Sequence, residues 1–147
     1  KGKLCYKNVL DIYKGYDRKA MEKLSGNVYE TLFGDFVVEK THLLDWAFES
    51  EESVLFCDAD ICFLGTLPAI DSSKQCGVSR HCIRDADEAK YGKYNAGFLY
   101  TNDKTLPSRW RELSKDSHFF EQACIEDLIN DYTYFTFDIN HSFQFMI

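Results

Sequence analysis

Residues 53–64 read SVLFCDADICFL, an apolar run that ends in two carboxylates spaced i, i+2. The stretch up to Cys57 holds β-branched and aromatic side chains and no charge, which is typical of a strand buried on both faces. Side chains two positions apart on an extended chain point the same way. We therefore expect Asp58 and Asp60 to project together from the carboxyl end of this strand, the edge at which open α/β sheets bind ligands.

These two carboxylates predict a cation site. Adjacent carboxylates repel each other unless a cation or a proton lies between them. A hard divalent ion satisfies both when phosphate oxygens complete its coordination shell, and oxygen-only ligands favour Mn²⁺ or Mg²⁺ over Zn²⁺. Asp58 and Asp60 are thus the predicted metal ligands, and the alternative is an acidic turn solvated by water.

The composition predicts one soluble globular domain over residues 1–147. Hydrophobic residues make up 45% and charged residues 28%, enough apolar surface for a core. The net charge of −7 argues against nonspecific nucleic-acid binding, which depends on basic patches. An anionic substrate stays possible, because a metal can carry its phosphates.

The ends of the sequence predict a fragment. The chain begins at Lys1, shows no signal-peptide pattern and stops on the apolar run FQFMI. No apolar run approaches the ~20 residues that a membrane span needs.

Six cysteines occur, none of them in a Cys-x-x-Cys motif. Cys57, Cys62 and Cys124 lie among apolar residues and are expected to be buried free thiols. Free thiols favour the cytoplasm, with the Golgi lumen as the alternative for a fragment. His81-Cys82 beside Cys76 leaves a thiol–imidazole metal site as a second interpretation.

The remaining patterns predict an α/β layout. We expect Thr41 to cap a helix over residues 41–49. Strands are predicted over residues 76–79, 94–100 and 132–137, further helices from Pro107 to about residue 115 and after a cap at Ser117, short helices ending near Gly15 and over residues 18–24, and a surface loop over residues 84–94. Residues 28–38 give no clear pattern. This order indicates a mainly parallel central sheet flanked by helices.

Three more segments join Asp58-Ala59-Asp60 in a known order: Lys40-Thr41-His42, Asn95-Ala96-Gly97 and Glu121-Gln122. With them the chain resembles, over roughly residues 38–130, the metal-dependent sugar-nucleotide glycosyltransferases of the Rossmann-like GT-A fold, especially the glycogenin and galactosyltransferase relatives. That family's signature is a helix carrying a Lys, a buried strand ending in Asp-x-Asp, an Asn-small-Gly turn and an acidic-Gln pair opening a later helix.

The resemblance implies transfer of a sugar from a nucleotide-diphosphate donor, with UDP-sugars favoured, to an acceptor hydroxyl on a glycan, protein or small molecule. A cation stabilises the charge on the departing diphosphate. The implied metal ligands are Asp58 and Asp60. The implied donor-binding residues are Lys40, Asp58, Asn95, Ala96 and Gly97. Gln122 is expected to face the reacting carbon and Glu121 to bind sugar hydroxyls, which makes these two the catalytic candidates. The nearest relatives retain configuration, so a retaining transfer is expected.

The chain departs from the family pattern at three places. No strand for the nucleobase precedes Lys1, and His141-Ser142-Phe143 lacks the glycine that usually follows a late metal-binding histidine. Glu121 replaces the aspartate of many relatives. The first two differences fit a fragment.

Two other classes of protein compete with this interpretation. A haloacid-dehalogenase-like Mg²⁺ phosphatase also places Asp-x-Asp at a strand end, with the first Asp as nucleophile, but it expects Gly-Thr directly afterwards, where Ile61-Cys62 lies here. A non-catalytic sugar- or nucleotide-binding module is the other, with Trp46, Trp110 and Tyr94 as rings that stack on a sugar.

Overall fold

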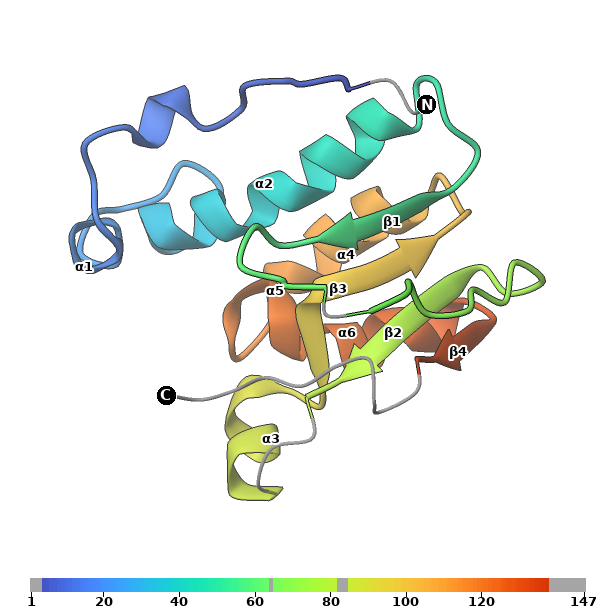
Figure 1. Ribbon diagram of the computed structural model, residues 1–147. Helices are drawn as coiled ribbons and strands as arrows, with labels where there is room; N and C mark the ends of the chain where they lie inside the picture. Colours follow the sequence, from blue (N-terminus) through green and yellow to red (C-terminus); the bar gives the residue numbers. More distant parts are fainter. Residues whose placement is uncertain (1–3, 64, 82–84, 138–147) are drawn as a thin grey trace.

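The computed structural model describes residues 4–63, 65–81 and 85–137. Its centre is an open four-stranded sheet of β1 (Val54–Cys57), β2 (Cys76–Arg80), β3 (Tyr94–Thr101) and β4 (Tyr134–Thr136), in the order β1-β3-β2-β4 (Figure 1). β3 runs antiparallel to β1 and β2, and β2 runs parallel to β4. The α/β class is confirmed. The expectation of a mainly parallel sheet is wrong, because β3 lies between two strands of opposite direction and makes two of the three described ladders antiparallel.

Helices cover one face of this sheet. α2 (Leu32–Ala47), α4 (Leu106–Ser114), α5 (Phe120–Ala123) and α6 (Ile125–Leu128) pack against one another and onto β1 and β3 (Figure 1). Leu44, Leu99, Trp110 and Leu128 are almost completely buried between the two layers. Burying a large apolar side chain stabilises the fold by roughly 1.5–3 kcal/mol. Trp110 and Tyr94 belong to this core, so neither is a ring platform for a sugar.

Aromatic side chains occupy the other face of the sheet. Phe98 and Tyr100 on β3 form a buried cluster with Phe137, and the rings of Phe98 and Phe137 lie 4.9 Å apart. Gly77 on β2 makes room for this layer, because a Cβ at that position would lie 2.4 Å from the ring of Phe135.

α2 begins nine residues earlier than the helix predicted to start at residue 41. Its cap is Thr31, whose hydroxyl oxygen accepts a hydrogen bond from the Gly34 N–H at 3.1 Å. The carboxylate of Asp35 also accepts three backbone N–H groups of the preceding loop. Thr41, the expected cap, is buried within the helix, where its hydroxyl donates to the Val38 carbonyl.

Two other expected segments differ from the structure. The loop predicted over residues 84–94 contains the helix α3 (Asp85–Tyr91), while residue 84 lies outside the described residues. The helix predicted after Ser117 is broken into α5, α6 and the 3₁₀ turn η2 (Ile129–Asp131), and Ser117 does not cap it. Phe120 has a φ of 44°, which is incompatible with a right-handed helix that continues back to Ser117, so α5 begins only at Phe120.

The other predicted elements are present. The strands over residues 76–79, 94–100 and 132–137 correspond to β2, β3 and β4, and Pro107 lies in the first turn of α4. The amino-terminal region is less helical than expected, with only the 3₁₀ turn η1 (Asp11–Tyr13) and the one-turn α1 (Arg18–Met21). No helix in the described ranges is long and apolar enough to cross a membrane.

The cysteines that the structure describes are all unpaired. Cys76 and Cys124 are buried, and Cys57 is partly buried. Cys62 is exposed, so the expectation of a buried thiol there is wrong.

Candidate functional site

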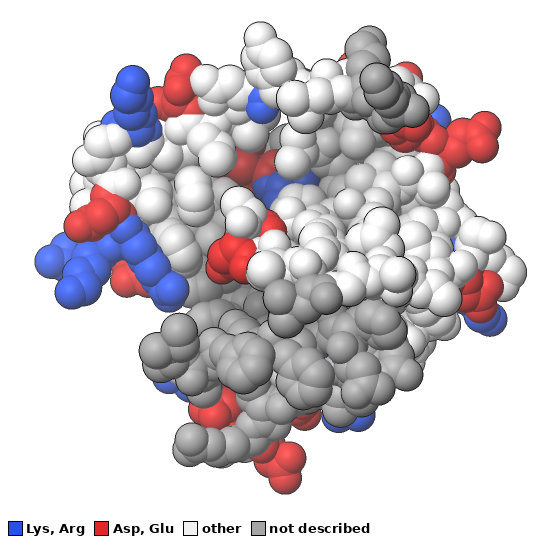
Figure 2. All heavy atoms as spheres, viewed as in Figure 1, with Lys and Arg blue, Asp and Glu red and all other residues white. Residues whose placement is uncertain are grey.

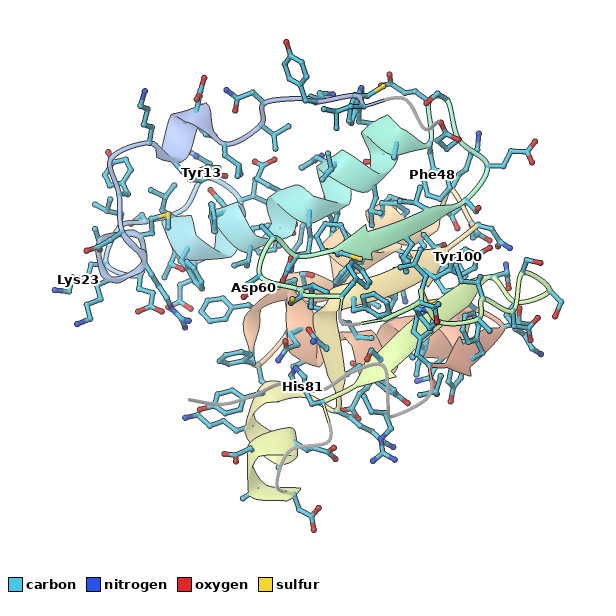
Figure 3. The ribbon with its side chains drawn as sticks, viewed as in Figure 1. Tyr13, Lys23, Phe48, Asp60, His81 and Tyr100 are labelled. Atoms are coloured by element: carbon cyan, nitrogen blue, oxygen red, sulfur yellow. The ribbon has the colours of Figure 1, made fainter. Side chains whose placement is uncertain are left out.

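The first carboxylate of the Asp-x-Asp motif lies at the end of the sheet. The Asp58 N–H donates to the Gly97 carbonyl at 2.8 Å, which extends the β1–β3 ladder by one residue. The chain then turns, since the Ile61 N–H donates to the Asp58 carbonyl at 3.1 Å. Asp60 is therefore an exposed residue of a turn (Figure 3), and the extended-chain argument for its side chain does not apply.

An irregular stretch of β3 lies beside Asp58. Val78 pairs with Leu99 and Arg80 pairs with Tyr94, so residues 95–98 face Ser79 alone. Such a bulge changes the direction in which the side chains of the strand point. Here the Asn95 side-chain oxygen accepts the Gly97 N–H at 2.7 Å.

Gly97 allows the carboxylate of Asp58 to approach the backbone of β3. A Cβ at this position would lie 2.6 Å from Asp58 Oδ2 and 3.0 Å from the Asn95 side-chain oxygen. Both distances are shorter than a van der Waals contact, so a larger residue would displace the carboxylate.

Lys40 of α2 joins the carboxylate of Asp58 to that of Glu121. Its Nζ lies 2.7 Å from Glu121 Oε1 and 3.5 Å from Asp58 Oδ1, and it donates to the Ala96 carbonyl at 3.5 Å. The side chains of Lys40 and Glu121 are 12% and 8% exposed, whereas that of Asp58 is 40% exposed. The cluster is therefore a buried ion pair beneath one carboxylate that is open to solvent. Figure 2 shows basic and acidic atoms meeting in a hollow near the middle of this face.

Packing holds the start of α5 in a strained conformation just before Glu121. Phe120 has a positive φ, and its ring contacts the rings of Phe33 and Phe119, both with centroids 5.0 Å away. The Trp110 indole N–H donates to the Glu121 carbonyl at 2.6 Å. A strained bulky residue persists only where its surroundings over-determine it, so these contacts fix the direction in which Glu121 points.

Gln122 lies on the same helix but belongs to a neighbouring polar group. Its amide nitrogen donates to the Tyr91 carbonyl at 2.8 Å, and its side chain lies beside the imidazole of His81. The amide nitrogen of Gln122 is thus engaged by the protein, whereas its amide oxygen takes no part in the contact with Tyr91.

His81 is a polar residue of this region that sequence reasoning assigned only to a metal site with cysteines. It is 4% exposed, and its Nδ1 lies 3.2 Å from the Gly92 carbonyl oxygen, which fixes the proton on Nδ1. Nε2 has no hydrogen-bond partner among the described residues. Burial lowers the pKa of His81, while the Gly92 carbonyl, Glu88 and Gln122 oppose that shift.

The thiol–imidazole metal interpretation gains no support from Cys76. Its side chain is completely buried, and burial raises the pKa of the thiol to about 12. A metal would need the thiolate. Cys82, the other residue of that interpretation, lies outside the described residues, as does His141.

The residues present are compatible with a hard divalent cation held by few protein ligands. Within the described ranges no group of three or more His, Cys, Asp or Glu residues is placed to hold a metal ion. Asp58 and Asp60 offer carboxylate oxygens, and Asp58 is open to solvent. Mg²⁺ and Mn²⁺ accept such a set when one or two carboxylates are supplemented by substrate phosphates and water.

The structure thus brings most of the predicted site residues together. Lys40, Asp58, Glu121 and residues 95–97 form one cluster, Gln122 lies beside it against His81, and Asp60 lies on the turn that follows β1. Chemically, the cluster carries the carboxylates of Asp58 and Glu121 against the ammonium of Lys40, so it can bind a cation and, through that cation, a ligand with negative charge and hydroxyl groups.

No protein-family model, curated protein or solved structure matches the chain. The geometry itself defines a class: a mixed α/β protein with an open four-stranded sheet, in which charged side chains gather at the carboxyl end of β1.

Proposed function

We propose that the chain is a glycosyltransferase that takes a sugar from a nucleotide-diphosphate donor, with UDP-sugars favoured, and passes it to an acceptor hydroxyl. One observation carries the proposal: residues from α2, β1, β3 and α5 converge on the open carboxylate of Asp58. A buried ion pair such as Lys40–Glu121 adds little net stability compared with apolar residues of the same volume. Ligand binding is therefore the better explanation for placing it there.

Asp58 and Asp60 are the residues that would hold the cation. When bound, a divalent cation neutralises the negative charge that builds on the departing diphosphate. Lys40 adds a fixed positive charge on the inner side, 3.5 Å from Asp58. Because it is paired with Glu121 and largely withdrawn from water, its position is set before the donor arrives, and preorganised charge is the most effective kind in a site of low dielectric constant.

The donor sugar is assigned to residues 95–97 and to Glu121. The side-chain amide nitrogen of Asn95, a partly exposed residue, supplies a hydrogen-bond donor, and Glu121 supplies a carboxylate oxygen for sugar hydroxyls. Gln122 faces the reacting carbon through its amide oxygen, because Tyr91 engages its nitrogen. We propose retention of configuration, since Glu121 is held by Lys40 and an inverting transfer needs a free general base for the acceptor.

The test is release of nucleoside diphosphate from a panel of sugar nucleotides, with and without Mn²⁺. We expect Mn²⁺-dependent release that Asp58→Asn abolishes and that Asp116→Asn, an exposed control far from β1 in sequence, leaves intact. Phosphate release from p-nitrophenyl phosphate with Mg²⁺, without any sugar-nucleotide turnover, would instead identify a phosphatase. Donor binding without turnover would identify a binding module, and either result overturns the proposal.

A further inference from the structure

Charge is distributed unevenly along this chain. Residues 1–28 contain seven Lys or Arg and three Asp or Glu, whereas the remaining residues contain 10 and 21. The first segment is therefore net positive in a protein whose overall charge is −7. We call the described part of it, residues 4–28, the amino-terminal arm.

The arm lies along α2, and few of its side chains are buried. It passes over α2, through η1 and down to α1 (Figure 1). Within the arm only Tyr13 and Met21 are buried. Tyr13 donates a hydrogen bond to Glu39 at 3.0 Å, and Tyr13 and Met21 pack in a small cluster with Phe33. The backbone of residues 24–28 is also tied to the start of α2, because the Leu24 carbonyl accepts the Leu32 N–H and the Asn27 and Val28 N–H groups donate to Asp35. Most of the arm's other side chains are exposed.

Many of those outward side chains are apolar. Leu4 and Tyr6 are 91% and 90% exposed, and Ile12 is 69% exposed. Leu10, Tyr16, Leu24 and Val28 are also exposed. Scattered exposed apolar residues are ordinary on a protein surface, but a run of them along one segment marks an interaction surface.

Uncompensated positive charge accompanies this apolar surface. Arg18 is engaged by Glu22 at 2.7 Å and lies over the ring of Phe33. Lys14, Lys19 and Lys23 are exposed, and none has an ion-pair partner within the described residues. Figure 2 shows basic atoms gathered at the left of the view, and Figure 3 places Lys23 there, beyond α1.

We propose that the amino-terminal arm binds the surface of an anionic lipid bilayer. Exposed apolar and tyrosine side chains enter the boundary between headgroups and acyl chains, while lysines pair with anionic headgroups. Nucleic acid would use the lysines but not the leucine and isoleucine side chains. The rest of the molecule carries the excess of acidic residues, so an anionic bilayer attracts the arm and repels the remainder, which orients the protein at the surface.

The proposal is tested by co-sedimentation of the chain with phosphatidylcholine vesicles and with vesicles containing 30% phosphatidylserine. We expect binding to the anionic vesicles that falls in high salt, because screening shortens the range of the attraction. Lys19→Glu combined with Lys23→Glu should weaken it about tenfold or more. Leu4→Ser combined with Tyr6→Ser should weaken it as well, and Lys115→Glu, an exposed lysine outside the arm, should not.

Three results would overturn the proposal. Equal binding to neutral and anionic vesicles removes the role of the lysines, and indifference of binding to both double variants removes the arm. Self-association that the Leu4/Tyr6 double variant abolishes, without vesicle binding, would show that the surface pairs two copies of the chain. Because the substituted side chains are exposed, unchanged circular dichroism is expected for every variant.

Discussion

Gly97 is the residue whose size most directly controls the candidate site. Its missing side chain leaves the space in which the Asp58 carboxylate lies, because a Cβ would be 2.6 Å from Oδ2. The same glycine donates its N–H to Asn95. One small residue thus sets the positions of a proposed metal ligand and of a proposed sugar-binding amide.

Gly97→Ala should therefore reduce Mn²⁺-dependent donor binding by about tenfold or more, because the new methyl group displaces the carboxylate, while overpacking lowers the free energy of unfolding by about 1–3 kcal/mol. Calorimetric titration measures the first effect and urea unfolding the second. Unchanged donor affinity in a folded variant would contradict the role given to Asp58.

His81 makes stability depend on pH near neutrality. Burial lowers its pKa below the ordinary value of about 6.5, so the folded protein holds the imidazole neutral where the unfolded chain binds a proton. The unfolded state therefore takes up more protons as the pH falls through about 6.5, and stability falls with it. Below the folded-state pKa both states are protonated and the loss stops.

We expect the protein to lose stability between pH 7.5 and 5.5, with a contribution from His81 of at most about 1.4 kcal/mol per pH unit. Urea unfolding at the two pH values should show a smaller loss for His81→Asn than for the wild type. His118→Asn, at an exposed histidine, should keep the wild-type loss. Equal losses in all three proteins would show that His81 is not the group responsible.

At the scale of elements, the start of α2 depends on one buried carboxylate. Asp35 accepts the N–H groups of Asn27, Val28 and Tyr29, which folds residues 27–30 back onto the first turn of the helix. The same helix carries Lys40, so this loop contributes to the placement of the candidate site.

Asp35→Ala should lower the free energy of unfolding by about 3 kcal/mol, because three backbone N–H groups lose a charged acceptor. Asp116→Ala, at an exposed aspartate, should change it by less than about 0.5 kcal/mol. Denaturant unfolding of the two variants makes the comparison. Similar small effects for both would mean that water replaces Asp35 at little cost.

The sequence predicted the elements whose pattern is local. β1 and β3 contain short apolar runs, and Pro107 lies in the first turn of α4, so their residues contain the signal. Helical periodicity alone predicts too late a start for α2, because that start depends on Thr31 and Asp35, whose side chains bind backbone N–H groups.

The features of the fold that the sequence does not predict depend on contacts between residues far apart in the chain. The left-handed Phe120 is held by Phe33 on another helix, and no pattern near residue 120 indicates it. The antiparallel direction of β3 depends on where the connection from β2 returns the chain, which the alternation of side chains does not indicate.

The same distinction applies to the candidate site. The end of a buried strand marks Asp58 in the sequence. The 2.7 Å contact between Lys40 and Glu121 joins residues 81 positions apart; the family resemblance names both residues but does not predict that they contact each other. The sequence shows His81 near two cysteines. Its contact with Gly92 and its position beside Gln122 depend on the fold between β2 and β3 and are not visible in the sequence.

At the scale of the whole molecule, apolar side chains pack on both faces of the sheet, and the charged side chains of the candidate site lie at its edge. Helices cover one face, aromatic rings fill the other, and charged groups collect where β1 ends. The amino-terminal arm adds a positive, partly apolar surface beyond α2. The two proposed ligands, a sugar nucleotide and an anionic bilayer, bind at charged groups that lie outside these packed apolar layers.

The proposed cation and nucleotide site at Asp58 is tested by calorimetric titration of UDP into the chain with and without Mn²⁺, repeated with Asp58→Asn and with Asp116→Asn. We expect Mn²⁺-dependent binding that weakens at least tenfold in Asp58→Asn and is unchanged in Asp116→Asn. Binding of UDP that is independent of Mn²⁺, or equally strong after Asp58→Asn, would contradict it.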